Sequence, residues 1–471
     1  MVSRETATGA TARPRASRPA AGSVPRLVVA GTSSGVGKTT VATGLMAALA
    51  ARGLAVAAFK VGPDFIDPSY HALATGRPAR NLDAFLSGPD LVAPLFAHGA
   101  AGADVAVVEG VMGLFDGASG RGELASTAQV AKLLGAPVLL VVDAGAMGRS
   151  VAAMVHGYAS FDPGLRVAGV VCNRVGSKRH ADLLREALEP LGVPLLGTLP
   201  RDEALRTPSR HLGLVPVAER PGDARDALAS LGARVAAALD LDAVLALARS
   251  APALPAAAWA PPAPEATRSP RRGAPGPSGR AGRVAVAGGP AFSFVYTENL
   301  ELLAAAGAEL LPLDPTRDEA LPEGSQALYL GGGFPEAHAE ALSANAPLRR
   351  AVAGFAGPVL AECGGLLYLC RQLDGLPMCG VLDADAAMTD RLTLGYREAE
   401  AATGSPLWAR GERARGHEFH YSSVTPGAGA APAWRLDRPE GFVAGRVHAS
   451  YLHTHWAATP QVAQRFLEAA A

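Results

Sequence analysis

The sequence predicts an α/β protein in which two doubly wound domains follow one another in a single chain. Three observations predict this. The chain has 471 residues, which is enough for two or three domains with cores of their own. Short apolar runs alternate with segments whose apolar residues recur at helical spacing. This alternation stops at a stretch rich in Pro, Ala and Gly and then starts again.

These changes in composition divide the chain into four parts. Residues 1–24 are rich in Arg, Ala, Thr, Ser, Pro and Gly and have no apolar core segment, so we expect a disordered extension rather than a signal peptide. Residues 25–250 form the first predicted domain, and residues 251–281 read as a Pro/Ala/Gly-rich linker. Residues 282–471 form the second predicted domain.

Overall composition excludes several classes of protein. Hydrophobic residues make up 49% of the chain, as in a globular protein. The 43 basic and 43 acidic residues cancel, and aromatic residues are only 5%, so we expect no nucleic-acid partner. No run of eighteen apolar residues predicts a membrane span. The four cysteines lack zinc-type spacing, and a chain of this length does not need disulfides, so we expect a cytoplasmic protein.

Each domain is predicted from its apolar runs. The strands expected in the first domain are 26–30, 54–60, 104–109, 137–143 and 167–172. Those expected in the second are 283–287, 327–330 and 358–361, with a helix at 298–306. Nearly continuous apolar strands suit a parallel sheet covered by helices on both faces. Ligands of such sheets bind beyond the carboxyl ends of the strands, so the residues that follow each strand should share one cleft.

A glycine-rich turn, Gly31–Thr40, follows the first strand and precedes a helical segment at 41–50. This is the context of a phosphate-binding loop, in which backbone N–H groups surround the phosphates, Lys38 reaches the outer phosphates and Thr39 meets Mg²⁺. The first glycine of the usual motif is replaced by Thr32, and a turn that only caps the helix is the alternative. The nucleotide-binding candidates are Thr32, Ser33, Gly35, Val36, Gly37, Lys38, Thr39 and Thr40.

Carboxylates follow the next two strands. Asp64 and Asp67 lie in a turn rich in Gly and Pro, where a simple turn role is the alternative, and Glu109 ends the third strand. Phosphoryl transfer needs carboxylates that place the metal. We therefore expect a metal set of Thr39, Glu109 and Asp64, and a substrate set of Asp64, Asp67 and Glu109. Weaker candidates are Asp116, Asp143 and the segment 172–174, which could contact a nucleotide base or form a simple loop.

The second domain contains a strand, a tight turn and a helix around Cys363, followed by two glycines. This pattern is typical of a nucleophile elbow with cysteine in place of serine, and we expect the helix N-terminus to lower the thiol pKa. A structural cysteine is the alternative, and we assign Cys172, Cys370 and Cys379 to it. A nucleophilic cysteine needs a base, for which His453 and His455 are candidates. The turn 331–336 offers backbone donors for an oxyanion hole.

Six motifs together carry a family resemblance. They occur in the order GTSSGVGKTT, KVGPDFIDPSYH, EGVMGLFDG, LYLGGGFPE, AECGGLLYL and GHEFHYS. The first half is similar to the P-loop group that includes dethiobiotin synthetase. The second half resembles a class I glutamine amidotransferase domain, which is flavodoxin-like, of the cobyric-acid-synthesis type. From Arg26 to Trp456, the chain resembles the cobyrinate (or hydrogenobyrinate) a,c-diamide synthase family.

The resemblance implies a reaction and assigns roles. Cys363 would attack the side-chain amide of L-glutamine, assisted by His453, with Gly332, Gly333 and Gly364 around the oxyanion. ATP with Mg²⁺ would phosphorylate a corrinoid carboxylate, and ammonia would displace the phosphate at the a and c acetates in cobalamin (vitamin B12) biosynthesis. The partners implied are ATP, L-glutamine and the corrinoid, without nucleic acid or membrane, and a homodimer is compatible with this.

Some alternatives stay open at this point. The wider amidotransferase pattern has a Glu two residues after the histidine, where this chain has His455, so the third member would be Glu336, Glu418 or none. Cobyric acid synthase and nickel-sirohydrochlorin a,c-diamide synthase share this build, but GPDFIDP followed by EGVMGLFDG favours the a,c-diamide enzymes. A regulatory ATPase of the MinD type would not retain the elbow around Cys363.

Overall fold

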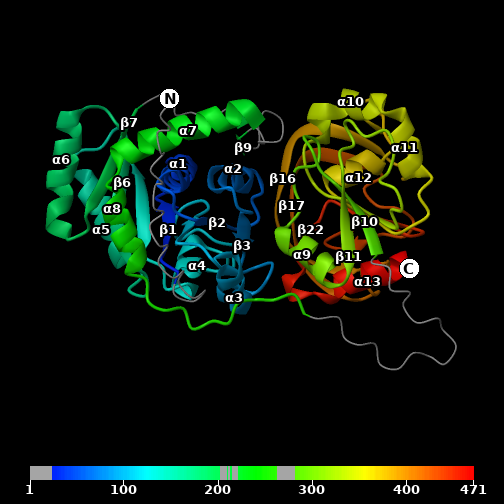
Figure 1. Cartoon of the computed structure of the whole chain (residues 1–471), viewed down its shortest axis with the longest axis horizontal. Helices are drawn as coiled ribbons and strands as arrows, with labels where there is room; N and C mark the ends of the chain where they lie inside the picture. The colour runs from blue at the N-terminus through cyan, green and yellow to red at the C-terminus, as the bar shows by residue number, and fades with distance from the viewer. Residues whose placement is uncertain (1–23, 202–208, 211–212, 215–220, 263–281) are drawn as a thin grey trace, which may run out of the picture.

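The computed structural model describes residues 24–201, 209–210, 213–214, 221–262 and 282–471. Figure 1 shows two lobes side by side, the first formed by the N-terminal half and the second by the C-terminal half. The predicted N-terminal extension, except Val24, lies outside the described residues, as does the part of the predicted linker at 263–281. The described part of that linker packs on the first lobe, where Trp259 is buried and its N–H donates to the carbonyl of Pro94 at 2.9 Å.

The first lobe contains the predicted parallel sheet. Its strand order is β3-β2-β4-β1-β5-β6-β7, and every neighbouring pair is parallel. The strands are β1 (Arg26–Gly31), β2 (Val56–Val61), β3 (Arg80–Leu82), β4 (Val105–Glu109), β5 (Val138–Asp143), β6 (Val167–Val175) and β7 (Leu195–Pro200). A two-stranded ribbon is formed by β8 (Ser209–Arg210) and β9 (Gly213–Leu214). All five strands predicted for this half are confirmed, and two unpredicted strands, β3 and β7, are added at the two edges of the sheet.

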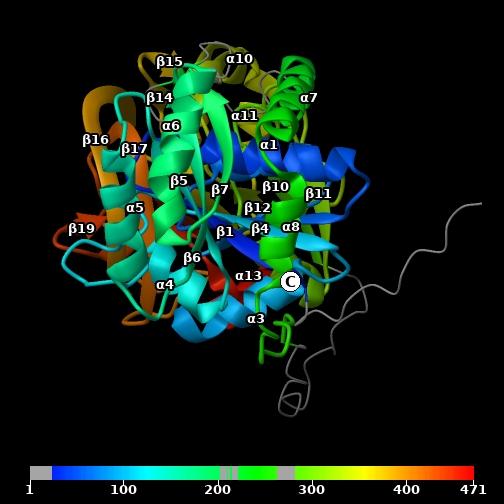
Figure 2. The same cartoon turned by 90° about the vertical axis from the view of Figure 1, so that its left-hand side faces the viewer.

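Helices cover both faces of this sheet, as the nearly continuous apolar strands predict. Alternate residues of β1 point to opposite sides, so Leu27 and Val29 pack with α1, α7 and α8, whereas Val28 and Ala30 pack with α3 to α6 (Figure 2). The helices are α1 (Lys38–Ala51), α2 (Ile66–Thr75), α3 (Pro89–Gly99), α4 (Thr127–Leu133), α5 (Ser150–Ser160), α6 (Lys178–Leu188), η2 (Glu189–Leu191), α7 (Pro221–Ala238) and α8 (Leu241–Arg249).

The second lobe is built on a six-stranded sheet of order β11-β10-β12-β13-β21-β20, parallel except for the last pair. The strands are β10 (Gly282–Ala287), β11 (Ala308–Leu313), β12 (Ala327–Leu330), β13 (Val359–Glu362), β20 (Phe442–Ala444) and β21 (Val447–Ser450). The helices are α9 (Thr297–Ala305), η5 (Pro335–His338), α10 (Ala339–Ala344), α11 (Ala346–Ala353), α12 (Gly364–Leu369), η6 (Trp456–Ala458) and α13 (Gln461–Ala470). The predicted strands and the helix near 298–306 are confirmed.

A second, mostly antiparallel sheet was not predicted. Its main members are the long strands β16 (Asp385–Ala401) and β17 (Arg413–Thr425), which lie between the lobes in Figure 1. The other strands are β14 (Gln372–Leu373), β15 (Leu376–Pro377), β18 (Trp434–Arg435), β19 (Pro439–Glu440) and β22 (His453–Thr454). Its position gives the second lobe a broad face toward the carboxyl ends of the first sheet. In the described ranges, no helix combines the length and the apolar character needed to cross a bilayer.

Candidate active site

The predicted phosphate loop connects β1 to α1 and is shaped by glycines. Gly35 and Gly37 have φ angles of 77° and 101°, which residues with a side chain adopt only with strain. A Cβ atom on Gly37 would lie 2.2 Å from Nδ2 of Asn173, so a side chain there would also have to displace the Asn173 amide. Asn173 donates a hydrogen bond of 2.8 Å to the carbonyl of Val36. This loop at a helix N-terminus has the form that surrounds a phosphate with N–H groups.

Polar side chains around the loop hold its conformation. Lys38 Nζ donates to the carbonyl of Ser33 at 2.9 Å, and burial, together with the charge of Lys60, lowers the pKa of Lys38 to about 8. Arg174 donates to the carbonyl of Gly35 at 2.9 Å. In the structure, the segment predicted for base contact therefore braces the phosphate loop. Thr32 and Val36 lie in the loop, and Thr39 and Thr40 in the first turn of α1.

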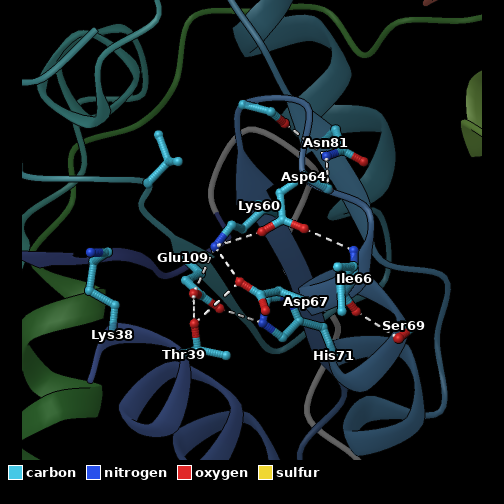
Figure 3. Close-up of polar contacts among 12 residues, drawn as sticks. Lys38, Thr39, Lys60, Asp64, Ile66, Asp67, Ser69, His71, Asn81 and Glu109 are labelled. Carbon is cyan, nitrogen blue, oxygen red and sulfur yellow. Dashed lines mark hydrogen bonds and ion pairs between the residues drawn. The ribbon is translucent and has the colours of Figure 1, made fainter. Parts of the chain in front are cut away.

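A buried ionic cluster lies beside the start of α1 (Figure 3). Lys60 at the end of β2 is 2.6 Å from the carboxylate of Asp67 and 2.8 Å from that of Glu109. The hydroxyl of Thr39 donates to Glu109 at 2.6 Å and is 3.2 Å from Asp67. The other oxygen of Glu109 is 2.6 Å from Nε2 of His71. The structure thus brings three of the predicted residues, Thr39, Asp67 and Glu109, to one point.

Lys60 determines how this cluster is charged. Burial alone would lower the pKa of Lys60, but the carboxylates of Asp67 and Glu109 raise it, so this lysine stays protonated. Burial raises the pKa of Asp67, and the charge of Asp64 adds to this effect. Burial also acts to raise the pKa of Glu109, but Lys60 and His71 outweigh it and hold that pKa low. Lys60 and His71 thus favour the anionic form of Glu109, whereas burial favours the neutral form of Asp67.

Asp64 lies at the more open side of this cluster. Its Oδ1 accepts the N–H of Ile66 at 2.8 Å, which is a turn contact, and its Oδ2 is 3.7 Å from Nζ of Lys60. The side chain of Asp64 is 29% exposed, compared with 12% for Asp67. Asn81 holds the turn by donating to the carbonyls of Gly62 and Asp64. Asp64 is thus both a turn former and the carboxylate most accessible to a substrate.

The two weaker acidic candidates make local contacts. Asp116 accepts the N–H of Gly113 at 2.9 Å. Asp143 pairs with Arg174 and accepts the N–H of Gly145. These contacts explain why both acids occur in their turns, and neither contacts the cluster around Lys60 in the hydrogen bonds described.

The predicted elbow is formed in the second lobe. Cys363 lies between β13 and α12 with φ 48° and ψ −96°, a strained conformation for a residue with a Cβ atom. Its N–H donates to the carbonyl of Ser450 at 2.8 Å, which holds the turn against β21. A Cβ atom on Gly365 would lie 2.1 Å from the carbonyl oxygen of Leu330, so the second glycine allows the elbow to pack on β12.

The three predicted oxyanion glycines surround this elbow. A Cβ atom on Gly364 would lie 3.1 Å from the backbone nitrogen of Gly333. A Cβ atom on Gly332 would lie 2.4 Å from Cε1 of His453. The elbow, the glycine turn and the histidine ring therefore meet at one place. Glycine is needed there because any side chain would occupy this space.

The expectation of a lowered thiol pKa is wrong for this state of the protein. Burial raises the pKa of Cys363, and the nearby carboxylates of Glu336, Glu362 and Glu418 add to the effect. The N–H of Gly364 acts in the opposite direction, but α12 has only six residues and its effect is outweighed. Cys363 is thus held as a neutral thiol.

His453 and His455 lie in different surroundings. The ring of His453 packs 4.9 Å from that of Phe294, and burial lowers the pKa of His453 to about 3, so it is neutral. His455 Nε2 lies 3.4 Å from the carboxylate of Glu298 instead. The structure therefore places His453 against the oxyanion turn and directs His455 toward the interface between the lobes.

The expected third member of a triad is not found. Among the residues that the structure describes, neither ring nitrogen of His453 has a hydrogen-bond partner, so neither Glu336 nor Glu418 fills that role. Glu418 instead forms an ion pair of 2.5 Å with Arg397. The carboxylate that holds the histidine strand is Glu362, which accepts both the N–H and the hydroxyl of Thr454 at 3.1 Å. The feature of the sequence that could have indicated this role is the position of Glu362 directly before Cys363.

The two sites lie on either side of one interface. The ring of Phe65, the residue after Asp64, stacks 4.3 Å from that of Phe294 and lies 6.2 Å from that of His453. Polar contacts join the lobes nearby, where Tyr396 donates to Asp83 at 2.7 Å. One aromatic side chain thus separates the carboxylate turn of the first lobe from the histidine of the second.

Comparisons with known proteins agree with this two-site structure. The family model described as CobQ/CobB/MinD/ParA nucleotide binding domain matches residues 27–215, and the CobB/CobQ-like glutamine amidotransferase domain matches residues 283–461. A protein of Streptomyces coelicolor named hydrogenobyrinate a,c-diamide synthase is 62% identical, covering 94% of this chain and 97% of its own. A Thermobifida fusca protein of that name is 53% identical over 95% and 97%. A Syntrophotalea carbinolica protein named cobyrinate a,c-diamide synthase is 46% identical over 95% and 98%. With a nucleotide-binding lobe, a cysteine elbow and this identity along nearly its whole length, the chain belongs to the hydrogenobyrinate and cobyrinate a,c-diamide synthase family.

Proposed function

We propose that this protein is an ATP- and glutamine-dependent ligase that converts the a and c acetate groups of hydrogenobyrinate or cobyrinate to amides. The observation that carries the proposal is the meeting of a phosphate loop with its carboxylates and a cysteine elbow at one interface. Hydrogenobyrinate is the favoured substrate, because relatives named for it are 51–62% identical, whereas relatives named for cobyrinate are 45–46% identical.

The second lobe is proposed to release ammonia from glutamine. The thiol of Cys363 transfers its proton to the neutral ring of His453 and attacks the side-chain amide carbon. The N–H groups at Gly333 and Gly364 donate to the oxygen that becomes negative. The amide nitrogen takes up the proton and leaves as ammonia, and a Cys363 thioester remains. Water then hydrolyses the thioester to glutamate.

The Arg397–Glu418 pair suits the other end of glutamine. Glu418 lies close enough to raise the pKa of Cys363, and it pairs with Arg397 at 2.5 Å. A guanidinium binds a carboxylate, and a carboxylate binds an ammonium group, so the pair is complementary to an amino acid zwitterion. Binding an ammonium group beside Glu418 would also offset its effect on the thiol. Prediction from motifs did not identify Arg397, since it lies on the unpredicted strand β16.

The first lobe is proposed to activate the carboxylate. An acetate oxygen of the corrinoid attacks the γ-phosphorus of ATP, the bond to ADP breaks, and the acyl phosphate is then displaced by ammonia to give the amide and phosphate. Lys38 and the loop N–H groups stabilise the charge on the transferred group. In this proposal, Asp64 and Asp67 orient the acetate and accept a proton from the attacking ammonia.

Mg²⁺ fits the residues at this site. The hydroxyl of Thr39 and the carboxylate of Glu109 are hard oxygen donors 2.6 Å apart, with Asp64 on the open side. No group of three or more His, Cys, Asp or Glu side chains in the described ranges could hold a metal by itself. This agrees with Mg²⁺ that is held by one or two protein oxygens together with nucleotide phosphates. When bound, the ion supplies positive charge to the phosphates.

A cytoplasmic location, a homodimer and the absence of a nucleic-acid partner are also proposed here.

A product assay tests the function. Purified protein is incubated with ATP, Mg²⁺, glutamine and either corrinoid, and mass spectrometry counts the acids converted to amides. We expect two conversions with hydrogenobyrinate. Lys38→Ala should reduce synthesis by about 10³-fold or more with glutamine or ammonia, because phosphoryl-transfer charge is no longer stabilised. Lys178→Ala, at an exposed lysine at the start of α6, is the matched control and should behave as wild type. Absence of amide product from either corrinoid in the wild type would reject the proposal.

A further inference from the structure

A large cavity lies between the lobes and shares Arg397, Thr454 and His455 with the site described so far. Its volume is about 880 Å³, near the upper end of the range for small-molecule sites. On one side it is lined by the loop that follows β3, at Leu86, Ser87 and Gly88. On the other side it is lined by β16 and β17, including Tyr396, Arg413 and Arg415.

The cavity lies at the same edge of the first sheet as the phosphate loop. Strands β1, β4, β2 and β3 are consecutive neighbours, and all are parallel, so their carboxyl ends share one edge. The phosphate loop follows β1, and the cavity loop follows β3. Neighbouring strands are about 4.8 Å apart, so the two loops are separated by about 14 Å. The ionic cluster of Glu109, Asp64 and Asp67 lies between them, after β4 and β2.

Tyr396 connects the cavity to that cluster. It lines the cavity, and its hydroxyl would lie 3.8 Å from a Cβ atom on Gly62, two residues before Asp64. The same face of this sheet continues to the glutaminase site, because His417 lies opposite both Tyr396 and His453 in the strand register. A molecule in the cavity therefore lies beside the acetate-activating turn and on the face that carries the catalytic histidine.

The charges on this face favour an acidic ligand. Arginines at 397, 413, 415 and 435 line the cavity, together with the acids Glu398, Glu400 and Asp437, and Arg397 is paired with Glu418. Two of these acids are already paired across the cavity edge, Glu398 with Arg121 at 3.0 Å and Glu400 with Arg435 at 2.6 Å. Arg415 is 4.0 Å from Glu398 and donates to the carbonyl of Phe85 at 3.3 Å. With Glu398 paired to Arg121 and Glu400 to Arg435, Arg413 and Arg415 outnumber the remaining acid, Asp437, and supply the net positive charge.

We propose that this cavity binds the polycarboxylate macrocycle of the corrinoid, with Arg413 and Arg415 holding carboxylates at its periphery while an acetate reaches the turn at Asp64. The assignment rests on the proposed function, which requires a large flat substrate with several carboxylates. Because about 14 Å separates the cavity loop from the phosphate loop, the corrinoid ring can bind away from ATP while one of its side chains approaches the γ-phosphate. It also allows a second acetate to replace the first after the ring shifts within the cavity.

Binding and kinetics on single-residue variants test this site. Equilibrium dialysis with hydrogenobyrinate, detected by its visible absorbance, gives the dissociation constant without ATP or turnover. Arg413→Gln and Arg415→Gln should each weaken binding and raise the KM for the corrinoid by about tenfold, the effect of one charge-assisted hydrogen bond. The KM for glutamine and the rate of glutamine hydrolysis should stay at wild-type values. Arg413→Lys, which keeps the charge, should recover most of the binding.

Arg410→Gln is the matched control, because Arg410 is an exposed arginine in the β16–β17 connection that does not line the cavity. If the wild type forms diamide and the double variant Arg413→Gln/Arg415→Gln binds hydrogenobyrinate as tightly as Arg410→Gln, the cavity assignment is wrong while the function stands. If the wild type neither binds nor amidates a corrinoid, the proposed function fails and the cavity assignment fails with it.

Discussion

In the first lobe, the charge of one lysine, Lys60, offsets the charges of three nearby acids, Asp64, Asp67 and Glu109. Lys60 is buried with Asp67 and Glu109 at hydrogen-bond distance, and His71 lies on the far oxygen of Glu109. Burying an ion pair brings little net stability, but removing one partner leaves an uncompensated charge. Lys60 therefore allows Asp67 and Glu109, the acids that we propose act in the reaction, to be placed inside the protein.

We expect Lys60→Met to lower the free energy of unfolding by about 3–5 kcal/mol, because Asp67 and Glu109 lose their counterion while still buried. Urea denaturation followed by circular dichroism measures this, with Lys178→Met as an exposed control. A stability equal to wild type would show that the cluster is already neutral in the folded protein.

Replacing each carboxylate by the corresponding amide shows whether its negative charge or its turn geometry is needed. Glu109→Gln should remove most synthesis with glutamine or ammonia, because the amide cannot supply the anion beside Thr39. Asp64→Asn and Asp67→Asn should impair synthesis but leave glutamine hydrolysis by Cys363 unchanged, and singly amidated product should accumulate. Product ratios by mass spectrometry decide this. Wild-type rates of synthesis in both Asn variants would show that residues 64–67 serve only as a turn, since Asn satisfies turn geometry as well as Asp.

Much of this residue-level picture is predictable where chemistry and local sequence coincide. Gly37, Lys38 and Cys363 are identified because a phosphate loop and an elbow each need glycines within a few residues. Glu362 and Arg397 are not, since their partners lie far along the chain or on strands that the pattern does not reveal. Lys60 is not, since its pairing with Glu109 joins residues 49 positions apart. The thiol pKa was mispredicted because burial and distant acids, which the sequence does not show, outweigh the N-terminus of a short helix.

Among the elements, α9 of the second lobe contacts both the first lobe and the strand that carries His453. Its Glu298 and Glu301 pair with Arg80 of β3 at 2.8 and 2.5 Å. Its Asn299 donates to the carbonyl of Thr454 at 2.9 Å and accepts the N–H of Trp456. One short helix thus contacts the first lobe through its acids and holds the backbone on the C-terminal side of His453.

This helix predicts a pH dependence. Burial acts to raise the pKa of Glu298, but the hydrogen bond and charge of His455 and the charge of Arg80 lower it from 4.5 to about 2. A carboxyl whose folded pKa is depressed contributes stability that is present above pH 4.5 and is lost as pH falls toward 2. The contribution is about 3 kcal/mol at neutral pH.

In Glu298→Gln, we expect lower stability near neutral pH and a flatter decline in this acid window than in wild type. Denaturant titrations at several pH values between 7 and 3, with Glu309→Gln as an exposed control on β11, measure the difference. Parallel curves for wild type and Glu298→Gln would contradict the role given to this interface.

The elements differ in how well the sequence predicts them. The nearly continuous apolar strands of the first sheet are confirmed because both of their faces are covered by helices. The long strands β16 and β17 were missed because one face packs on the second lobe and the other carries charged residues toward the interface. In the strand 385–401, Asp, Arg and Glu residues interrupt the apolar residues, so its full length does not show the alternation of an ordinary strand.

At the scale of the whole molecule, the two lobes place an ammonia-forming site and an ammonia-using site on one interface. The stacking of Phe65 on Phe294 and the contact of Tyr396 with Asp83 set this arrangement, and it depends on elements that are distant in sequence. Free ammonia is protonated in bulk water, so a short distance between the sites preserves the nucleophile. The two motifs predicted two chemistries, and the fold explains why one chain carries both.

The most direct test of the division of labour between the lobes compares glutamine with ammonia as the nitrogen source for Cys363→Ala. Its rate of hydrogenobyrinate diamide formation is measured with glutamine and with excess ammonia, beside wild type and a Cys379→Ala control. We expect Cys363→Ala to form no diamide from glutamine but to form it from ammonia at close to the wild-type rate, while Cys379→Ala uses both. Loss of ammonia-dependent synthesis in Cys363→Ala, or retention of glutamine-dependent synthesis, would contradict the division of the reaction between the two lobes.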